Sequence, residues 1–262
     1  RDSLWNDLHR LTNRLPSDLL RFATSRYGPS LVDEAWSEFT LFTEEAFNRE
    51  SLHLPVFIPW FLHEWTPDPV ATIVPKADLD AFPLGCEYLR RRGRYDDRLT
   101  IRYLKSCRDS AFSFLDVVDV TPGSGCIMHD VLTGWEGEAI EKSGSQTLRK
   151  GDILFAKVVT VDEVTILDGC APIAFPPLER APIIDLRKRM RKAHRLVTPD
   201  VVRDYRLELL EIYHSTAERL LNPTRPVLQN TDGEPLVFCR ITYEVPSARA
   251  AFDALRHLCL NT

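Results

Sequence analysis

The feature that most constrains the fold of this chain is a series of short apolar runs over residues 111–177, separated by glycine-containing turns. The runs are rich in β-branched and aromatic residues, which is typical of β-strands. They cover residues 112–120, 126–132, 136–142, 146–148, 153–159, 164–167 and 170–175. Their spacing leaves no room for crossover helices, which argues against a parallel sheet. The pattern predicts a small antiparallel sheet that curls or closes on itself.

The residues before this series have helical patterns. Leucines recur at helical spacing from Leu4 to Leu15, and Pro16 is expected to end that helix. Ser17 then suits the cap of a second helix, which Gly28 terminates. Residues 54–65 are the most apolar stretch of this half and contain two prolines, so we expect a kinked, buried helix there.

The residues after the series are also mostly helical. An apolar stripe predicts a helix over residues 183–195, and Thr198 suits the start of a helix that runs to about Leu221. A strand over residues 236–245 and a last helix capped by Ser247 complete the chain. The predicted fold class is therefore α+β. We divide it into a helical region (1–110), a small antiparallel β-barrel-like unit (111–178) and an α/β tail (179–262).

Composition excludes several classes of protein. The chain has 262 residues, enough for a sizeable core, and a net charge of −5, which argues against a generally basic nucleic-acid binder. Its six cysteines form no C-x-x-C pair, a usage typical of reduced thiols in a cytoplasmic protein. No run of eighteen apolar residues suggests a membrane span. The sequence starts at Arg1 and not at Met, so we expect a piece of a longer protein.

Several short motifs together resemble those of a known group. They are Leu54-Pro55, Pro59-Trp-Phe-Leu, Phe112-Ser-Phe, Val120-x-Pro-Gly123, Asp130-Val-Leu-Thr-Gly134 and Gly151-Asp-Ile-Leu-Phe-Ala156. This arrangement is similar to that of uncharacterised bacterial proteins that carry a SEC-C zinc-binding motif. The resemblance implies a bacterial protein of unknown activity. The zinc motif of that group, which begins with C-x-C, is absent from this chain, so zinc does not carry over.

Candidate catalytic and metal-binding residues are few. Cys126 with His129 is one of two close Cys/His pairs, and its spacing matches no standard zinc pattern, so we expect no metal and no cofactor. Cys126 or Cys170 could act as a nucleophile with His129, but a cysteine in a strand is more often a small core residue. A hydrolase with a site near His129 and Asp130 stays open as one hypothesis.

The helix over residues 183–195 is the clearest candidate for a binding surface. It carries basic residues on one side, where they could follow a phosphate backbone. Those residues are Arg187, Lys188, Arg191, Lys192 and Arg195. Phe155 and Lys157 alternate onto one face of their predicted strand, as an aromatic and cationic nucleic-acid surface would. The competing interpretation is that the basic face is solvated or pairs with acids such as Asp33, Glu34, Glu44 and Glu45.

These observations favour a non-catalytic binding or scaffold protein over an enzyme, because no catalytic signature is present. We expect a protein partner, no membrane contact and a cytoplasmic location. A nucleic-acid-binding module that uses the basic helix and the strand pair Phe155 and Lys157 is the first alternative. A hydrolase is the second.

Overall fold

The structure is a computed structural model that describes residues 2–223, 244–245 and 247–256. The chain separates into two compact units, Arg1–Asn222 and Pro223–Thr262. The helices of the first unit are α1 (Asp2–Tyr27), α2 (Ser30–Phe39), α3 (Leu54–His63), α4 (Lys76–Leu79), α5 (Leu84–Arg92), α6 (Arg98–Arg108), α7 (Arg180–Ala193), α8 (Pro199–Asp204) and α9 (Arg206–Leu221). Its strands are β1 (Phe112–Thr121), β2 (Gly125–Asp130), β3 (Glu136–Ile140), β4 (Ile153–Val161) and β5 (Val164–Cys170).

The five strands form a closed barrel in the order β1-β2-β3-β5-β4. Every pair is antiparallel except β3 and β5, which meet in parallel at Ile140 and Ile166. An odd number of strands cannot alternate in direction around a closed ring, so one parallel pair is required. This strand order is that of the OB-fold, a five-stranded Greek-key barrel. The structure thus confirms an α+β fold built on a small closed barrel.

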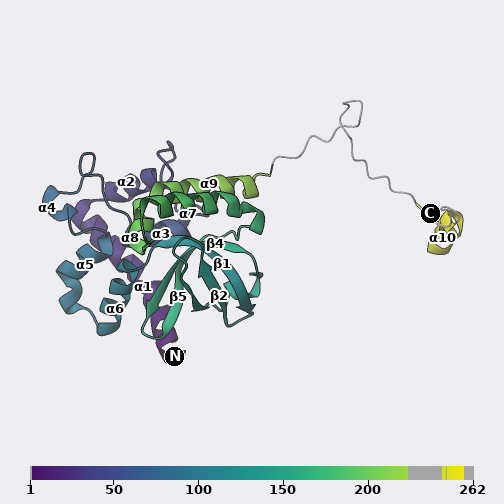
Figure 1. Cartoon of the computed structure of the whole chain (residues 1–262), viewed down its shortest axis with the longest axis horizontal. Coiled ribbons are helices and arrows are strands. Elements are labelled where there is room, and N and C mark those ends of the chain that lie inside the picture. Colours follow the sequence, from purple (N-terminus) through teal and green to yellow (C-terminus); the bar gives the residue numbers. More distant parts are fainter. Residues whose placement is uncertain (1, 224–243, 246, 257–262) are drawn as a thin grey trace. The chain divides into compact units, whose positions relative to one another are not determined.

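The barrel has two apolar surfaces, and each belongs to a different hydrophobic core. The inward side chains form a small core of their own, which includes Leu115, Met128 and Leu154. The outward side chains of β4 and of the first half of β1 belong to the large core shared with the helices. Phe155 of β4, for example, stacks on Tyr213 of α9 with ring centroids 4.8 Å apart. The helical region, the barrel and α7–α9 therefore share one core, and α7 and α9 lie side by side above the barrel (Figure 1).

The prediction that Pro16 ends the first helix is wrong, because α1 continues through Pro16 to Tyr27. An apolar stripe runs unbroken along one side of α1, and Leu15 and Leu19 on either side of the proline are buried. Proline within a helix costs roughly 3 kcal/mol, whereas burying each leucine contributes roughly 1.5–3 kcal/mol. Packing of the stripe thus outweighs the lost hydrogen bond. Gly28 ends the helix as predicted, with φ of +87°.

Three other elements differ from prediction. Residues 146–148 are not a strand, since a short 3₁₀ turn (Gly144–Gln146) replaces it. Residues 170–175 add only an isolated bridge between Ile153 and Phe175. The helix after Thr198 is split at Tyr205, whose ring packs edge-on against His194. Within the described residues, no helix is long and apolar enough to cross a bilayer.

The second unit is described only in part. Its helix α10 (Ala248–Leu255) begins as predicted, because the Ser247 side chain accepts a hydrogen bond from the Ala250 amide. Phe252 and Leu255 on this helix are exposed within the described residues. The strand predicted over residues 236–245 lies almost entirely outside the described residues. The three-part division at residues 110 and 178 stays a prediction.

Candidate functional site

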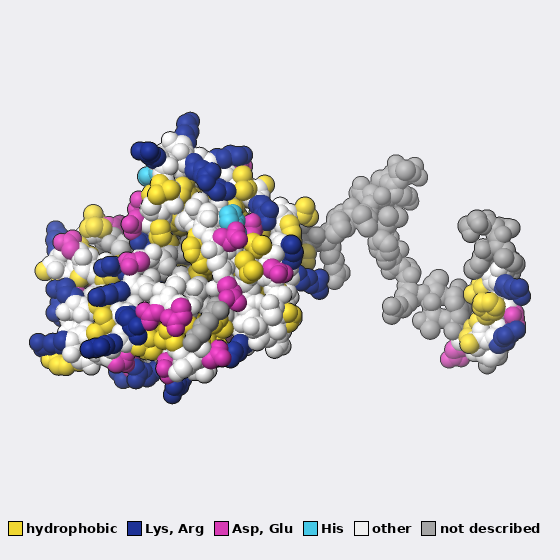
Figure 2. Space-filling view, turned by 60° about the horizontal axis from the view of Figure 1, so that its bottom comes forward, with side chains coloured by type: hydrophobic (Ala, Val, Ile, Leu, Met, Phe, Trp, Pro, Cys, Tyr) yellow, Lys and Arg dark blue, Asp and Glu magenta, His cyan; other side chains and the backbone are white. Residues whose placement is uncertain are grey.

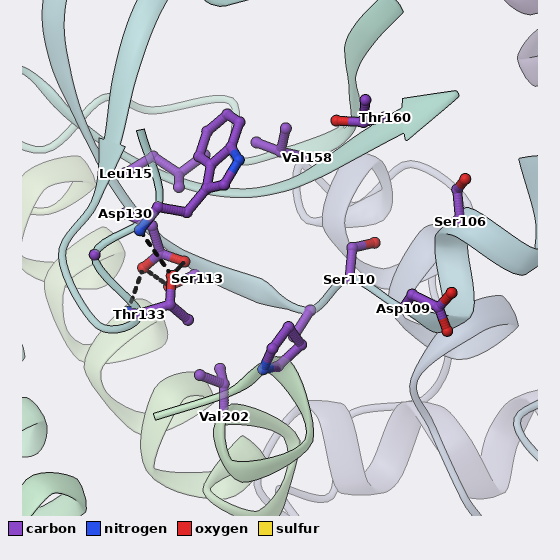
Figure 3. Close-up of a pocket in the computed structure, with 14 residues that line it drawn as sticks. Ser106, Asp109, Ser110, Ser113, Leu115, Asp130, Thr133, Val158, Thr160 and Val202 are labelled. Atoms are coloured by element: carbon purple, nitrogen blue, oxygen red, sulfur yellow. Dashed lines mark hydrogen bonds between the residues drawn. The ribbon is translucent and has the colours of Figure 1, made fainter. Parts of the chain in front are cut away.

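A cavity of about 590 Å³ lies where the barrel meets α6 and α8 (Figure 3). That volume lies within the range of ligand-binding pockets, roughly 300–1,000 Å³. One wall is apolar and includes Trp135, Leu115 and Val158 of the barrel with Val202 of α8. The remaining lining is rich in hydroxyl groups: Ser106 and Ser110 at the end of α6, Ser113 on β1, Thr133 after β2 and Thr160 on β4. Asp109 and Asp130 contribute carboxylates.

The Asp130 carboxylate shapes one side of this pocket. Its Oδ1 accepts hydrogen bonds from the Ser113 hydroxyl at 2.6 Å and the Leu132 amide at 2.8 Å, and its Oδ2 accepts one from the Thr133 hydroxyl at 2.7 Å. The buried carboxylate therefore fastens the turn between β2 and β3 to β1, as the dashed lines of Figure 3 show. With these partners satisfied, Asp130 is a structural element of the pocket wall.

The described residues that line the pocket include no histidine, cysteine, lysine or arginine. The Ser113 hydroxyl already donates a hydrogen bond to the Asp130 carboxylate, so it forms part of the pocket wall. An aromatic and aliphatic wall opposite hydroxyl groups suits binding through packing and hydrogen bonds.

His129 and Asp130 do not form a joint site. Consecutive residues of a strand point to opposite faces, and only Asp130 faces the pocket. His129 lies on the other face, where its Nδ1 is 3.9 Å from Asp116 Oδ2. The cysteines considered as nucleophiles are also poor candidates, because burial raises the pKa of Cys126 to about 11 and that of Cys170 to about 12. The structure separates the residues on which the hydrolase hypothesis depends.

The prediction that Phe155 and Lys157 form an exposed surface is wrong. They do share one face of β4, as strand alternation requires, but that face is covered by helices and both side chains are buried. Lys157 Nζ donates hydrogen bonds to Glu64 Oε1 at 2.7 Å and to the Ser110 carbonyl at 2.8 Å. Neither residue can contact a nucleic acid.

The basic residues of α7 lie largely on the surface. Ile183, Leu186 and Met190 bury the opposite side of the helix, as predicted. Lys188, Arg191 and Lys192 of α7 are exposed, and Arg187 is half-buried beside the turn at Gly134. Arg195 is also exposed but follows the helix, which ends at Ala193 and not at residue 195 as predicted. Among the described residues, the only ion pair of this exposed group joins Lys188 to Asp185 of the same helix, at 2.9 Å.

The acids expected to pair with α7 do not reach it. The described ion pairs include none between α7 and Asp33, Glu34, Glu44 or Glu45. Glu34 instead accepts a hydrogen bond from the Ile73 amide. Pairing with these four acids is therefore wrong for the described residues, whereas Lys188 does pair with Asp185 and the other exposed residues of the basic group are solvated.

The barrel face that OB-folds use for oligonucleotides and oligosaccharides, around the second and third strands, is acidic here. Strand pairing sets Asp116 beside His129 and Glu136, and sets Asp119 beside Ile127 and Glu138. Asp116 on this face is ion-paired with Arg180 of α7 at 2.6 Å. Figure 2 shows one side of the whole molecule, on which basic and acidic side chains are interspersed and form no broad basic surface.

Comparison with known proteins adds one match. Residues 87–203 are similar to a family of unknown function (DUF7986). This segment covers less than half of the chain, from within α5 through the barrel and α7 into α8. No curated protein and no solved structure matches the chain significantly.

Sequence reasoning missed the pocket. Its lining comes from four separate segments, around residues 106–115, 130–135, 158–160 and 199–202. Serine and threonine are common in turns, so none of these segments carries a recognisable signal. The pocket exists because the end of α6 and the start of α8 lie against the same part of the barrel, which is a tertiary relationship.

Proposed function

We propose that this chain is a non-catalytic binding protein that recognises a protein partner through the pocket between the barrel, α6 and α8. The observation that carries the proposal is the lining: an apolar wall around Trp135 faces a row of hydroxyl groups. Extended protein segments offer backbone amides for such hydroxyls and side chains for such a wall.

A cytoplasmic location forms part of this proposal. The described cysteines Cys86, Cys107, Cys126 and Cys170 are free thiols, as expected in a reducing compartment. The relationship to SEC-C-associated bacterial proteins is likewise a proposal, supported by the short motifs around Pro59, Gly134 and Gly151.

Affinity capture from cell lysate, with and without nuclease, tests the proposal. Ser106→Trp fills the pocket from α6, whereas Lys105→Trp adds the same side chain one residue earlier on the exposed side. We expect the wild-type chain and Lys105→Trp to retain a protein that Ser106→Trp loses, regardless of nuclease. Equal capture by all three chains would refute the pocket as the recognition site.

A nucleic-acid-binding module is the second candidate, favoured by the exposed cations of α7. The double variant Arg191→Glu/Lys192→Glu removes two of them, and Arg49→Glu/Lys76→Glu makes the same change of charge at exposed sites on other elements. Retention that is lost with nuclease and in the α7 variant alone, and that falls steeply with salt, would support this candidate and contradict the first.

A further inference from the structure

Three potential metal ligands from distant parts of the sequence meet between the helices and the barrel. They are His63 at the end of α3, Cys107 near the end of α6 and Asp168 on β5. One ligand atom of each lies within 4.8 Å of those of the other two. His63 and Cys107 are buried, with 4% and 0% of their surface exposed.

The Asp168 carboxylate is only half satisfied. Its Oδ1 accepts a hydrogen bond from the Tyr103 hydroxyl. Its Oδ2 is shielded from solvent and has no hydrogen-bond partner. Leaving a buried carboxylate oxygen unpaired is costly, so this atom calls for a proton or a cation.

The nearest ammonium group does not meet that need. Lys157 Nζ is bonded to Glu64 Oε1 at 2.7 Å and to the Ser110 carbonyl at 2.8 Å. Its positive charge is therefore balanced by Glu64, and no hydrogen bond joins it to Asp168 within the described residues. Asp168 Oδ2 is therefore left without a hydrogen-bonded or ion-paired cation within the described residues.

We propose that His63, Cys107 and Asp168 bind a divalent transition-metal ion, with Zn²⁺ the best match to their nitrogen, sulfur and oxygen donors. Three atoms at most 4.8 Å apart share a centre within about 2.8 Å of each, and zinc needs about 2.0–2.3 Å. Moving each donor inward by about 0.5–0.8 Å would bring all three within bonding distance of the ion. The Tyr103 hydroxyl, which donates a hydrogen bond to Asp168 Oδ1, would orient the carboxylate as outer residues of metal sites do.

The charges also fit. A thiolate and a carboxylate neutralise a divalent ion, so a loaded site adds no net charge to the buried region. A neutral imidazole and a thiolate are the forms of histidine and cysteine that bind such an ion, so binding would release the thiol proton and strengthen as pH rises.

The role of such a metal is structural. Because Cys107 and His63 are closed off from solvent, no substrate reaches them. The ion would join α3 and α6 to β5, and so tie the helical region to the barrel. This ligand set shares no residue with a C-x-C zinc motif, and it is independent of the pocket proposed for the protein partner.

The full chain, stripped of metal and titrated with Co²⁺, tests the proposal. We expect one Co²⁺ per chain with a thiolate-to-cobalt charge-transfer band, displacement by one Zn²⁺, and one zinc per chain by elemental analysis after purification without chelator. Cys107→Ser should lose the band. Asp168→Asn, which keeps the shape of the side chain, should weaken binding at least about tenfold, and Tyr103→Phe by about 10–100-fold.

Controls distinguish this site from other cysteines. Cys126→Ser changes a buried cysteine inside the barrel, and Cys239→Ser/Cys259→Ser changes the two outside the described residues, so both should keep the band. Circular dichroism checks that each variant folds. A chain that takes up no Co²⁺ at excess metal over a range of pH would overturn the proposal. So would a band that survives in Cys107→Ser, or binding unchanged in a folded Asp168→Asn.

Discussion

The Lys157 ammonium lies 2.7 Å from the Glu64 carboxylate, and both side chains are buried between the helices and the barrel. Glu64 Oε1 also accepts the Phe112 amide at 2.6 Å, so the pair joins the end of α3 to the first residue of β1 and to β4. Removing one partner would leave the other charge buried and unpaired. We therefore expect Lys157→Met to lower the free energy of unfolding by about 3–5 kcal/mol.

A double-mutant cycle checks this coupling by urea denaturation. Glu64→Gln removes the opposite charge, and the double variant has no buried charge left. We expect the double variant to be less destabilised than the sum of the two single variants. Strict additivity of the three changes would mean that the two groups do not depend on each other.

Gly169 of β5 marks a close approach between the barrel and α3. A Cβ at this position would lie 2.7 Å from Phe112 Cζ, 2.9 Å from Pro59 Cγ and 3.1 Å from the Pro55 carbonyl oxygen. Gly169→Ala should therefore destabilise the fold by about 1–3 kcal/mol, measured by thermal or urea unfolding. Gly93→Ala is the control, because its nearest contact is Leu89 Cδ2 at 3.4 Å. An equal effect at both glycines would show that crowding is not the cause.

His214 of α9 should make stability depend on pH. Burial and the neighbouring His53 lower its pKa from 6.5 to about 4, while its Nε2 contacts the Phe39 carbonyl at 2.9 Å. Between these values the unfolded chain binds a proton that the folded chain does not, so stability is lost as pH falls from 6.5 to about 4. The loss from this group reaches up to about 3 kcal/mol.

His214→Gln keeps a donor for the Phe39 carbonyl and does not titrate. Its free energy of unfolding should fall less steeply than that of the wild type between about pH 6.5 and pH 4. His9→Gln, an exposed histidine on α1, serves as the control and should follow the wild-type curve. Parallel curves for wild type and His214→Gln would contradict the assignment.

Asp78 should make stability depend on pH in a more acidic range than His214 does. Burial alone would raise its pKa, but the hydrogen bond from Arg26 and the charges of Arg26 and Arg91 outweigh burial and hold the pKa below 3.8. Its stabilising effect is present above 3.8 and is lost as pH falls through the lower folded value. Unfolding of Asp78→Asn and of wild type should therefore differ near neutral pH and converge in acid. Asp80→Asn, an exposed neighbour, should match the wild type throughout.

Local patterns were enough to predict the strands that form the barrel. The five runs that became β1–β5 alternate and end at turn residues such as Gly123, so nearest neighbours specify them. The prediction of a strand at residues 146–148 is wrong because three residues do not distinguish a strand from a turn. The prediction that a helix ends at Pro16 is wrong for a different reason. Proline locally disfavours the helix, but packing of the whole apolar stripe stabilises it through this residue.

For the candidate sites, the sequence predicts only which residue types are present and which of them share one face of a strand. Alternation places Phe155 and Lys157 on one face of β4, yet it does not say whether water or helices cover that face. The pocket and the ligand cluster at His63, Cys107 and Asp168 combine segments that carry no motif in common.

The sequence by itself determined where the chain turns, which segments are strands and which side of α7 is apolar, because these depend on residues a few positions apart. The tertiary structure alone decided that the barrel closes with β3 beside β5 and that one barrel face is buried under helices. It also decided that Asp168 lies against His63 and Cys107. These outcomes depend on contacts between distant segments, and such contacts form only when the whole core packs.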